Sequence, residues 1–207
     1  MSTPEARRPL ASRSTRWAAF IAGSAVRAGF TADGISILSL VFAAAGSAAL
    51  LYLPQPWNLL ACAAGIQLRL LCNLIDGMVA VEGGKKSKVG VLYNEVPDRA
   101  ADSMFLVALG YAIGIPWLGW LAALVAAVTA YIRVLGGTFG LAQDFRGPMA
   151  KQHRMAVMTA GCLLGMVEYW WNGSLYLLEA AAWLIAAGAV VTCGTRIRAI
   201  AAQLEAR

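Results

Sequence analysis

The feature of this sequence that most constrains its fold is a series of apolar stretches, each long enough to cross a lipid bilayer. A membrane-spanning helix needs roughly 20 mostly apolar residues. The chain is 59% hydrophobic and 14% charged, whereas an ordinary soluble domain has about 25% charged residues. The sequence therefore predicts an all-α integral membrane protein with six transmembrane helices, and it excludes a disordered chain. The expected spans are 33–53, 57–81, 95–114, 116–137, 152–171 and 174–193.

Positively charged residues are distributed unevenly among the connections between these spans. The turns at 53–58, 113–116 and 171–174 contain no Lys or Arg. Because basic connections stay on the cytoplasmic side, this asymmetry predicts a cytoplasmic (inner) membrane protein with both termini in the cytoplasm. The net charge of +6 is attributed to this topology, so no nucleic-acid partner is expected. The basic residues on the cytoplasmic side are Arg7, Arg8, Arg13, Arg16, Arg27, Lys85, Lys86, Lys88, Arg146, Lys151, Arg154, Arg196, Arg198 and Arg207.

We expect a single membrane domain over residues 1–207. Within it, 1–16 is a cytoplasmic tail, 33–193 is the six-helix bundle and 194–207 is a second cytoplasmic tail. Residues 17–27 place apolar side chains on one helical face between two arginines, as helices that lie along a membrane surface do. A loop is the alternative for that segment.

Small residues recur inside the predicted spans. Gly136 and Gly140 are four residues apart, as are Gly161 and Gly165, and this spacing lets helices approach closely. It fits packing within the chain or a homodimer, and we favour packing within the chain. The cysteines lie in apolar stretches without paired spacing, which indicates small packing residues. They are Cys62, Cys72, Cys162 and Cys193.

Polar residues interrupt the apolar pattern where the second span ends and the third begins. Steps of three and four residues place each group on one helical face. The connector between the two groups is short and rich in glycine, so we expect the helices to run side by side with their polar faces together. The first group is Arg69, Asn73, Asp76 and Ala80, and the second is Asn94, Asp98 and Asp102.

Such a cluster of carboxylates just inside a membrane surface costs several kcal/mol unless it is compensated. A divalent cation compensates it, because Mg²⁺ and Mn²⁺ prefer oxygen ligands. Gly77 and Ala80 lack bulk, so a ligand can approach the backbone there. The alternative is a polar network that pairs the helices, in which Arg69 neutralises the acids.

The same segment resembles the signature of the CDP-alcohol phosphatidyltransferases, D-x2-D-G-x2-A-R-x8-G-x3-D-x3-D. Every spacing fits, but Asn73 and Asn94 replace the first and third aspartates and Val81 replaces the arginine. The resemblance extends to the six-span layout and to the start of the first span, FTADGISILSL at 30–40. The matching positions are Asn73, Asp76, Gly77, Ala80, Val81, Gly90, Asn94 and Asp98.

The resemblance implies an enzyme of phospholipid synthesis. It would transfer a phosphatidyl group from a CDP-linked lipid to an acceptor alcohol and release CMP, with Mg²⁺ or Mn²⁺ as cofactor. Membrane lipid and a second copy of the chain are the other partners implied. Asp98 is implied as the general base. The implied metal ligands are Asn73, Asp76, Asn94 and Asp98, to which we add Asp102 as a replacement carboxylate. The implied nucleotide-binding positions are Asp76, Gly77, Ala80 and Gly90.

The substitutions predict an altered metal site. Each asparagine still offers a carbonyl oxygen but removes one negative charge, so we expect weaker or rearranged metal binding. Arg69 either pairs with Asp76 or replaces the charge absent at Val81. The alternative function is a catalytically altered or silent family member that binds lipid or a partner. A transporter is less favoured, because its charges should lie near the membrane midplane.

A second polar group is expected to bind the acceptor. Its basic residues suit a phosphorylated acceptor such as a polyol phosphate, because Arg contacts phosphate with two hydrogen bonds and Lys adds a point charge. Ordinary loop charge is the alternative. His153 is expected to be solvated, and Glu168 and Glu179 to be interfacial or paired. The predicted acceptor-binding residues are Arg133, Arg146, Lys151 and Arg154.

Overall fold

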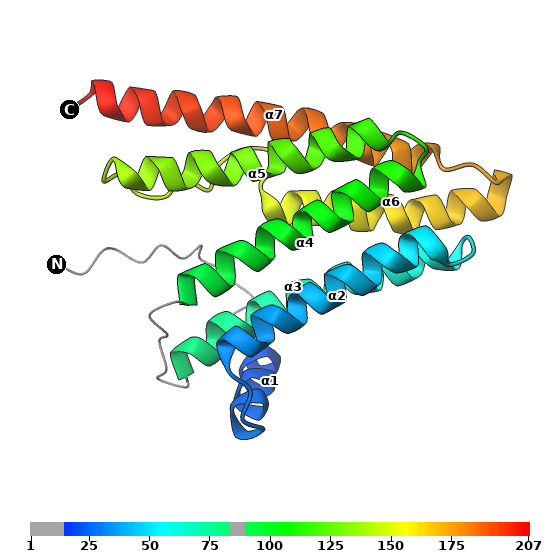
Figure 1. Cartoon of the computed structure of the whole chain (residues 1–207), viewed down its shortest axis with the longest axis horizontal. Helices are drawn as coiled ribbons and strands as arrows, with labels where there is room; N and C mark the ends of the chain where they lie inside the picture. Colours follow the sequence, from blue (N-terminus) through cyan, green and yellow to red (C-terminus); the bar gives the residue numbers. More distant parts are fainter. Residues whose placement is uncertain (1–14, 83–89) are drawn as a thin grey trace.

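The computed structural model describes residues 15–82 and 90–207, and the side chains of 80–82, 91 and 94 lie outside the described part. In the described residues all regular structure is helical. The longer helices run lengthwise through the molecule, and the short α1 lies beside the end of the bundle where α2 begins (Figure 1). The helices are α1 (Arg16–Arg27), α2 (Ala32–Tyr52), α3 (Trp57–Glu82), α4 (Gly90–Ala112), α5 (Pro116–Thr138), α6 (Lys151–Asn172) and α7 (Tyr176–Glu205).

The helices joined by the uncharged turns pack against each other as pairs, as predicted: α2 with α3, α4 with α5, and α6 with α7. Glycines let the first two pairs approach closely. A Cβ at Gly65 would lie 2.8 Å from the Cα of Gly46, and a Cβ at Gly119 would lie 2.9 Å from the Cα of Gly110. Such close approach is the packing mode that small residues allow in a membrane.

Three of the four glycines noted in the sequence, Gly136, Gly161 and Gly165, lie against other helices of the chain. A Cβ at Gly161 would lie 2.7 Å from the Cβ of Ala181 on α7, and one at Gly136 would lie 3.1 Å from the side chain of Ile200. Gly140 lies just beyond α5 with φ +72°. The cysteines are all free, in agreement with a packing role.

Four helices are long and apolar enough to cross a membrane among the residues that the structure describes: 32–52, 57–79, 116–138 and 176–205. The chain is therefore an all-α membrane protein. α4 and α6 carry more charge, and much of it is buried against other helices, as at Asp98, Asp102 and Arg154. Charged groups within a membrane are expected to face the interior in this way. A count of six spans stays a prediction.

Two element boundaries differ from those expected. α4 begins at Gly90, before the predicted start at 95, and α7 continues to Glu205 instead of ending near 193. Most of the expected tail at 194–207 is therefore helix, because Ala, Leu, Gln and Arg favour helix and no proline interrupts them. The first fourteen residues of the other expected tail, 1–16, lie outside the described residues, as do Lys85, Lys86 and Lys88.

The segment predicted as a surface helix is α1. Its Ala18 and Ala22 are fully buried and belong to a small apolar cluster with Cys72 and Ile75 of α3. Trp17 and other apolar side chains of α1 remain exposed. A position at the membrane surface stays a prediction.

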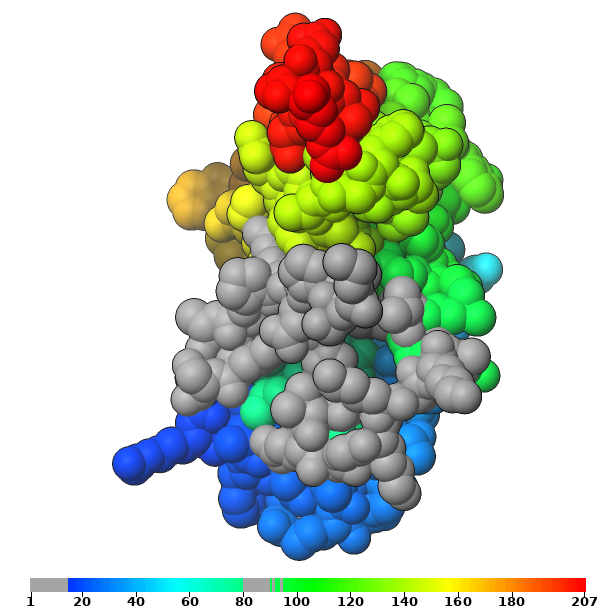
Figure 2. All heavy atoms as spheres, turned by 90° about the vertical axis from the view of Figure 1, so that its left-hand side faces the viewer, coloured from blue at the N-terminus to red at the C-terminus, as the bar shows by residue number. Residues whose placement is uncertain are grey.

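The connection between α5 and α6 folds back along the bundle, so that α6 begins well inside it (Figure 1). Seen end-on, this connection lies next to the C-terminal end of α7 (Figure 2). Thr192 of α7 anchors it, because the Thr192 Oγ1 accepts a hydrogen bond from the Met149 N–H at 2.9 Å. Gly147 has φ +120°, and a Cβ there would collide with the Thr192 side chain. The connection thereby fixes where Lys151 and Arg154 enter the bundle.

Candidate active site

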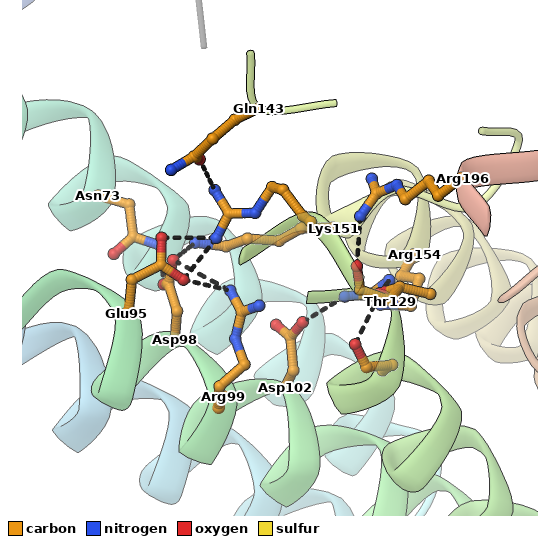
Figure 3. Close-up of polar contacts among 12 residues, drawn as sticks. Asn73, Glu95, Asp98, Arg99, Asp102, Thr129, Gln143, Lys151, Arg154 and Arg196 are labelled. Carbon is orange, nitrogen blue, oxygen red and sulfur yellow. Dashed lines mark hydrogen bonds and ion pairs between the residues drawn. The ribbon is translucent and has the colours of Figure 1, made fainter. Parts of the chain in front are cut away.

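Asp98 of α4 is the centre of the polar cluster (Figure 3). Its Oδ1 accepts hydrogen bonds from Arg69 Nη2 at 3.2 Å and from Asn73 Nδ2 at 3.0 Å. Its Oδ2 forms an ion pair with Lys151 Nζ, and Arg99 Nη2 lies 3.8 Å from the same oxygen. Side chains of α3, α4 and α6 therefore meet at one buried carboxylate.

The polar faces of α3 and α4 meet through side chains. The main packing partners of α3 are α2 and α6, and those of α4 are α2 and α5. The expectation that the two helices run side by side is therefore wrong. α2 packs against both α3 and α4. The long side chain of Arg69 on α3 reaches across to the carboxylates of Asp98 and Asp102 on α4.

Asp102 lies one turn beyond Asp98 and is 3% exposed. Its Oδ1 is 2.8 Å from Arg69 Nη2, and its Oδ2 is 2.7 Å from Arg154 Nη2. Arg69 thus pairs with Asp98 and Asp102, instead of with Asp76 as one of our interpretations had it. The Asp102 carboxylate is occupied by two arginines where we expected a metal ligand. This much of the cluster matches the alternative of a helix-pairing network.

Asp76 has a different environment. It is 5% exposed, and its Oδ2 accepts a hydrogen bond from Ser36 Oγ at 2.7 Å. Ser36 belongs to the segment at 30–40 whose pattern resembled the family's first span. Within the described part of the chain, Asp76 forms no ion pair. A buried carboxylate without a cation is costly, so Asp76 is the position that favours an added cation.

A basic half of the site faces these acids. Arg133 of α5 is 8% exposed; its Nη2 is 2.6 Å from both carboxylate oxygens of Glu95, and its Nη1 donates to Gln143 Oε1 at 3.0 Å. Arg154 of α6 is 1% exposed and donates to the Met149 carbonyl at 2.9 Å.

Sequence reasoning missed Arg196. It is 4% exposed, and its guanidinium donates to the Thr129 carbonyl at 2.6 Å and to the Arg146 carbonyl at 3.0 Å. The residue was assigned to the tail, so its burial was not expected. Its place four residues after Thr192, on the same helical face, was the available signal. Glu95, the partner of Arg133, was also missed.

Other predicted residues lie elsewhere. The Arg146 side chain is 63% exposed and pairs with Asp144, so it does not join the buried arginines. His153 is exposed, as expected, and its Nδ1 lies 2.9 Å from the Pro148 carbonyl. Glu168 is paired, because it accepts hydrogen bonds from Ser174 and from the first backbone N–H groups of α7.

The positions predicted to bind nucleotide are described only in part. Gly77 lies in α3 directly after Asp76, and Gly90 is the first residue of α4. The side chains of Ala80, Val81 and Asn94 lie outside the described residues.

Known proteins resemble this chain over most of its length. A comparison with models of protein families gave no match. An archaetidylinositol phosphate synthase of Aeropyrum pernix is 32% identical over 151 residues, which cover 72% of this chain and 74% of that protein. The chain belongs to the CDP-alcohol phosphatidyltransferase family. A phosphatidylinositol phosphate synthase of Mycobacterium marinum is 27% identical over 184 residues, 86% of this chain and 76% of that protein.

Solved structures share the fold of this CDP-alcohol phosphatidyltransferase. A crystal structure of Mycobacterium tuberculosis phosphatidylinositol phosphate synthase with CDP-DAG bound has a TM-score of 0.74 at 24% identity and covers 90% of this chain and 94% of that one. A second, in complex with manganese and citrate, also has a TM-score of 0.74, with 88% of each chain covered. The sequence-based class, a transferase of phospholipid synthesis in the CDP-alcohol phosphatidyltransferase family, is confirmed by the relatives.

The residues of this CDP-alcohol phosphatidyltransferase fit a hard cation at Asp76. Its buried carboxylate lies one helical turn from Asn73, whose amide oxygen points away from Asp98 (Figure 3). Carboxylate and amide oxygens are suitable ligands for Mg²⁺ and Mn²⁺. Among the described residues no three or more His, Cys, Asp or Glu side chains form a metal-binding group. Amide, water or substrate oxygens must therefore complete the ligand set.

Proposed function

We propose that this protein transfers a phosphatidyl group from a CDP-linked diacylglycerol lipid to a phosphorylated polyol of the inositol phosphate type, with release of CMP. Family membership supports the general reaction, and the names of the relatives support the acceptor class. The observation that carries the proposal is a set of three buried basic side chains, Arg133, Arg154 and Arg196. Arg133 and Arg154 pair with Glu95 and Asp102 of α4, the helix that also carries Asp98. Such side chains suit an anionic acceptor.

The charges of the site support the same substrate class. Among the side chains that the structure describes, six cationic groups lie in or beside the cluster, against four carboxylates, so an anionic substrate restores the balance. The cations are Arg69, Arg99, Arg133, Lys151, Arg154 and Arg196, and the carboxylates are Asp76, Glu95, Asp98 and Asp102.

A divalent cation held by Asp76 and Asn73 would supply the positive charge that neutralises the pyrophosphate oxygens and stabilises the leaving CMP. Asp98 accepts the proton of the acceptor hydroxyl. That oxygen attacks the phosphorus that carries the lipid, and the bond between this phosphorus and the CMP oxygen breaks. Arg196 and Arg133 hold the acceptor phosphate, while Arg69 and Arg154 keep the acidic side chains in position. Gly77 and Gly90 lie where the nucleotide is expected.

The test is CMP release by the purified full-length protein with CDP-diacylglycerol, Mg²⁺ or Mn²⁺, and a panel of acceptors. We expect CMP with inositol phosphate and little with free inositol or serine, since these lack the phosphate. Equal rates with free inositol would overturn the phosphorylated acceptor. No CMP with any acceptor would overturn the reaction.

Arg196→Gln tests the acceptor side. Loss of one charged contact should raise the KM for inositol phosphate roughly 10- to 100-fold, while the KM for the CDP-lipid changes little. Arg198→Gln is the matched control, because Arg198 lies on the same helix and is exposed. Equal effects of the two variants would contradict the role of Arg196.

The second candidate is a catalytically altered or silent member of the family. Asn73 and Asn94 favour it, because each removes a charge from the signature, and so do the ion pairs that occupy Asp98 and Asp102. This protein would still bind the CDP-lipid but would not release CMP.

The cellular arrangement belongs to the same proposal. We place a six-span domain in the cytoplasmic membrane with both termini in the cytoplasm, so that the site lies at the inner leaflet. The lipid tails then stay in the bilayer while the nucleotide and acceptor stay in water. We also propose that the protein forms a homodimer, because it resembles a family whose members commonly do.

A further inference from the structure

We infer that Lys151 is a built-in cation of this site: its ammonium group occupies Asp98, so that the site takes one divalent cation, at Asp76 and Asn73, instead of the two that resemblance to the family's signature aspartates implies. The inference deepens the proposed function and rests on it for the nature of the substrate. Its basis is the unequal environment of the acids. Asp98 and Asp102 each have at least two cationic partners, whereas Asp76 forms no ion pair with the described residues.

Lys151 is held in place by the backbone around it. It is the first residue of α6, and the preceding connection is anchored where Met149 binds Thr192. A positive side chain at the N-terminus of a helix is unfavourable, because the helix dipole presents its positive end there. No acidic residue lies in the first turn of α6 to offset this. The Asp98 carboxylate offsets the repulsion between Lys151 and the helix dipole. This explains why the lysine side chain points into the site.

A second divalent cation at Asp98 would meet strong repulsion. Lys151 would have to leave, and Arg69 would remain beside the same carboxylate. Arg69 is fully buried, so water does not screen its charge, and like charges at such distances repel strongly in a protein interior. The position at Asp98 is therefore closed to a second ion while Lys151 is present; once Lys151 is removed, a carboxylate introduced at position 73 would offset the remaining charge of Arg69.

Asn73 agrees with this arrangement. Its amide nitrogen donates a hydrogen bond to the Asp98 Oδ1 at 3.0 Å, which an aspartate at the same position could not do. An aspartate would instead add a negative charge facing Asp98 and would favour a further cation between the two. Asn73 and Lys151 thus act together at Asp98. Asn73 removes a negative charge that a second metal ion would neutralise, and Lys151 supplies a positive charge in place of that ion.

Direct measurement of bound Mn²⁺ tests the inference. Full-length protein with CDP-diacylglycerol and no acceptor is titrated with Mn²⁺, and bound ions are counted by electron paramagnetic resonance. We expect one Mn²⁺ per chain and a spectrum without coupling between ions. Asn73→Asp alone should still bind one, because Lys151 remains. The double variant Asn73→Asp with Lys151→Ala should bind two that are coupled. Asn73→Asp with Lys151→Arg is the matched control and should bind one.

The possible results test the one-cation inference and the proposed reaction separately. Two ions in the unaltered protein, none, or one in the Lys151→Ala double variant would overturn the inference. The count in the unaltered protein decides even where a variant does not fold. CMP release is then measured after inositol phosphate is added to the same samples. Two bound ions with CMP release would leave the proposed function standing without the inference. One ion without CMP release would leave the inference standing without the reaction.

Discussion

Asp98 is the residue on which the proposed chemistry depends most directly. It collects hydrogen bonds and ion pairs from three helices, and the proposed reaction requires its carboxylate to accept a proton. Asp76 has the complementary role, since it is buried beside Ser36 without an ion pair. The two aspartates that the signature retains are therefore not equivalent.

Asp98→Asn should lower the rate of CMP release by roughly 10²- to 10⁴-fold, the usual contribution of a general base. The amide is similar in size but cannot accept the proton. Glu205→Gln, at the exposed end of α7, should keep full activity. An Asp98→Asn protein with normal activity and an unchanged elution profile would remove Asp98 from the catalytic role.

Arg69 has a structural role that its neighbour Arg99 lacks. Arg69→Leu leaves two buried carboxylates each short of a cation, which should cost about 3–5 kcal/mol. The thermal midpoint should then fall by roughly 10 °C in detergent. Arg99→Leu is the matched control: its ion pairs are longer, at 3.7 and 3.8 Å, and its side chain is 28% exposed, so about 1 kcal/mol or less is expected. Equal shifts would contradict this difference.

At the scale of elements, glycine contacts hold the paired helices together. In α5, a Cβ at Gly119 would lie 2.7 Å from the Leu106 carbonyl oxygen, whereas one at Gly137 would have nothing within 4 Å. Gly119→Ala should therefore destabilise the protein by about 1–3 kcal/mol. Gly137→Ala should be neutral or slightly stabilising, because alanine favours helix. Thermal unfolding of both variants checks this, and equal midpoints would disprove the contact.

The connection before α6 can be tested in the same way. Gly147→Ala forces both a positive φ and a collision with Thr192, so it should displace Lys151 and reduce CMP release at least 10-fold. Gly173 also has a positive φ, at +75°, but its Cβ would have open space at the opposite end of the bundle. Gly173→Ala should cost about 1–2 kcal/mol of stability and keep its activity. A full loss of activity in Gly173→Ala would show that backbone strain, and not the collision with Thr192, accounts for the loss of activity in Gly147→Ala.

The sequence predicted the elements better than the contacts between them. Apolar length and uncharged turns determine the ends of α2, α3 and α5, because these signals are local. The end of α7 was misplaced, since the sequence beyond 193 changes in polarity but not in helix propensity. The partners of Arg69 depend on α2 separating α3 from α4, and the burial of Arg196 depends on the folded-back connection. The first arrangement has no local signal in the sequence, and the second has only the four-residue spacing of Arg196 from Thr192.

At the scale of the whole molecule, the α6–α7 turn and the end of α7 lie at opposite ends of the bundle (Figure 1). If the polar site faces the cytoplasm, as basic connections predict, a tag after Arg207 should be protected in intact spheroplasts. A tag inserted between Gly173 and Ser174 should be accessible from outside. Protease or antibody accessibility checks this, and the opposite pattern would invert the proposed topology.

The folded-back connection has a consequence for how such a site can change its preference. Its last residues are fixed on α7, because Met149 binds Thr192 and Gly147 lies against the Thr192 side chain, while the acids proposed to hold the CDP-lipid belong to α3 and α4. Residues early in the connection, such as Gln143 and Phe145, contact Arg133, which is proposed to bind the acceptor. Under the proposed function, substitution in this short stretch would change which alcohol is accepted while α3 and α4 keep their geometry.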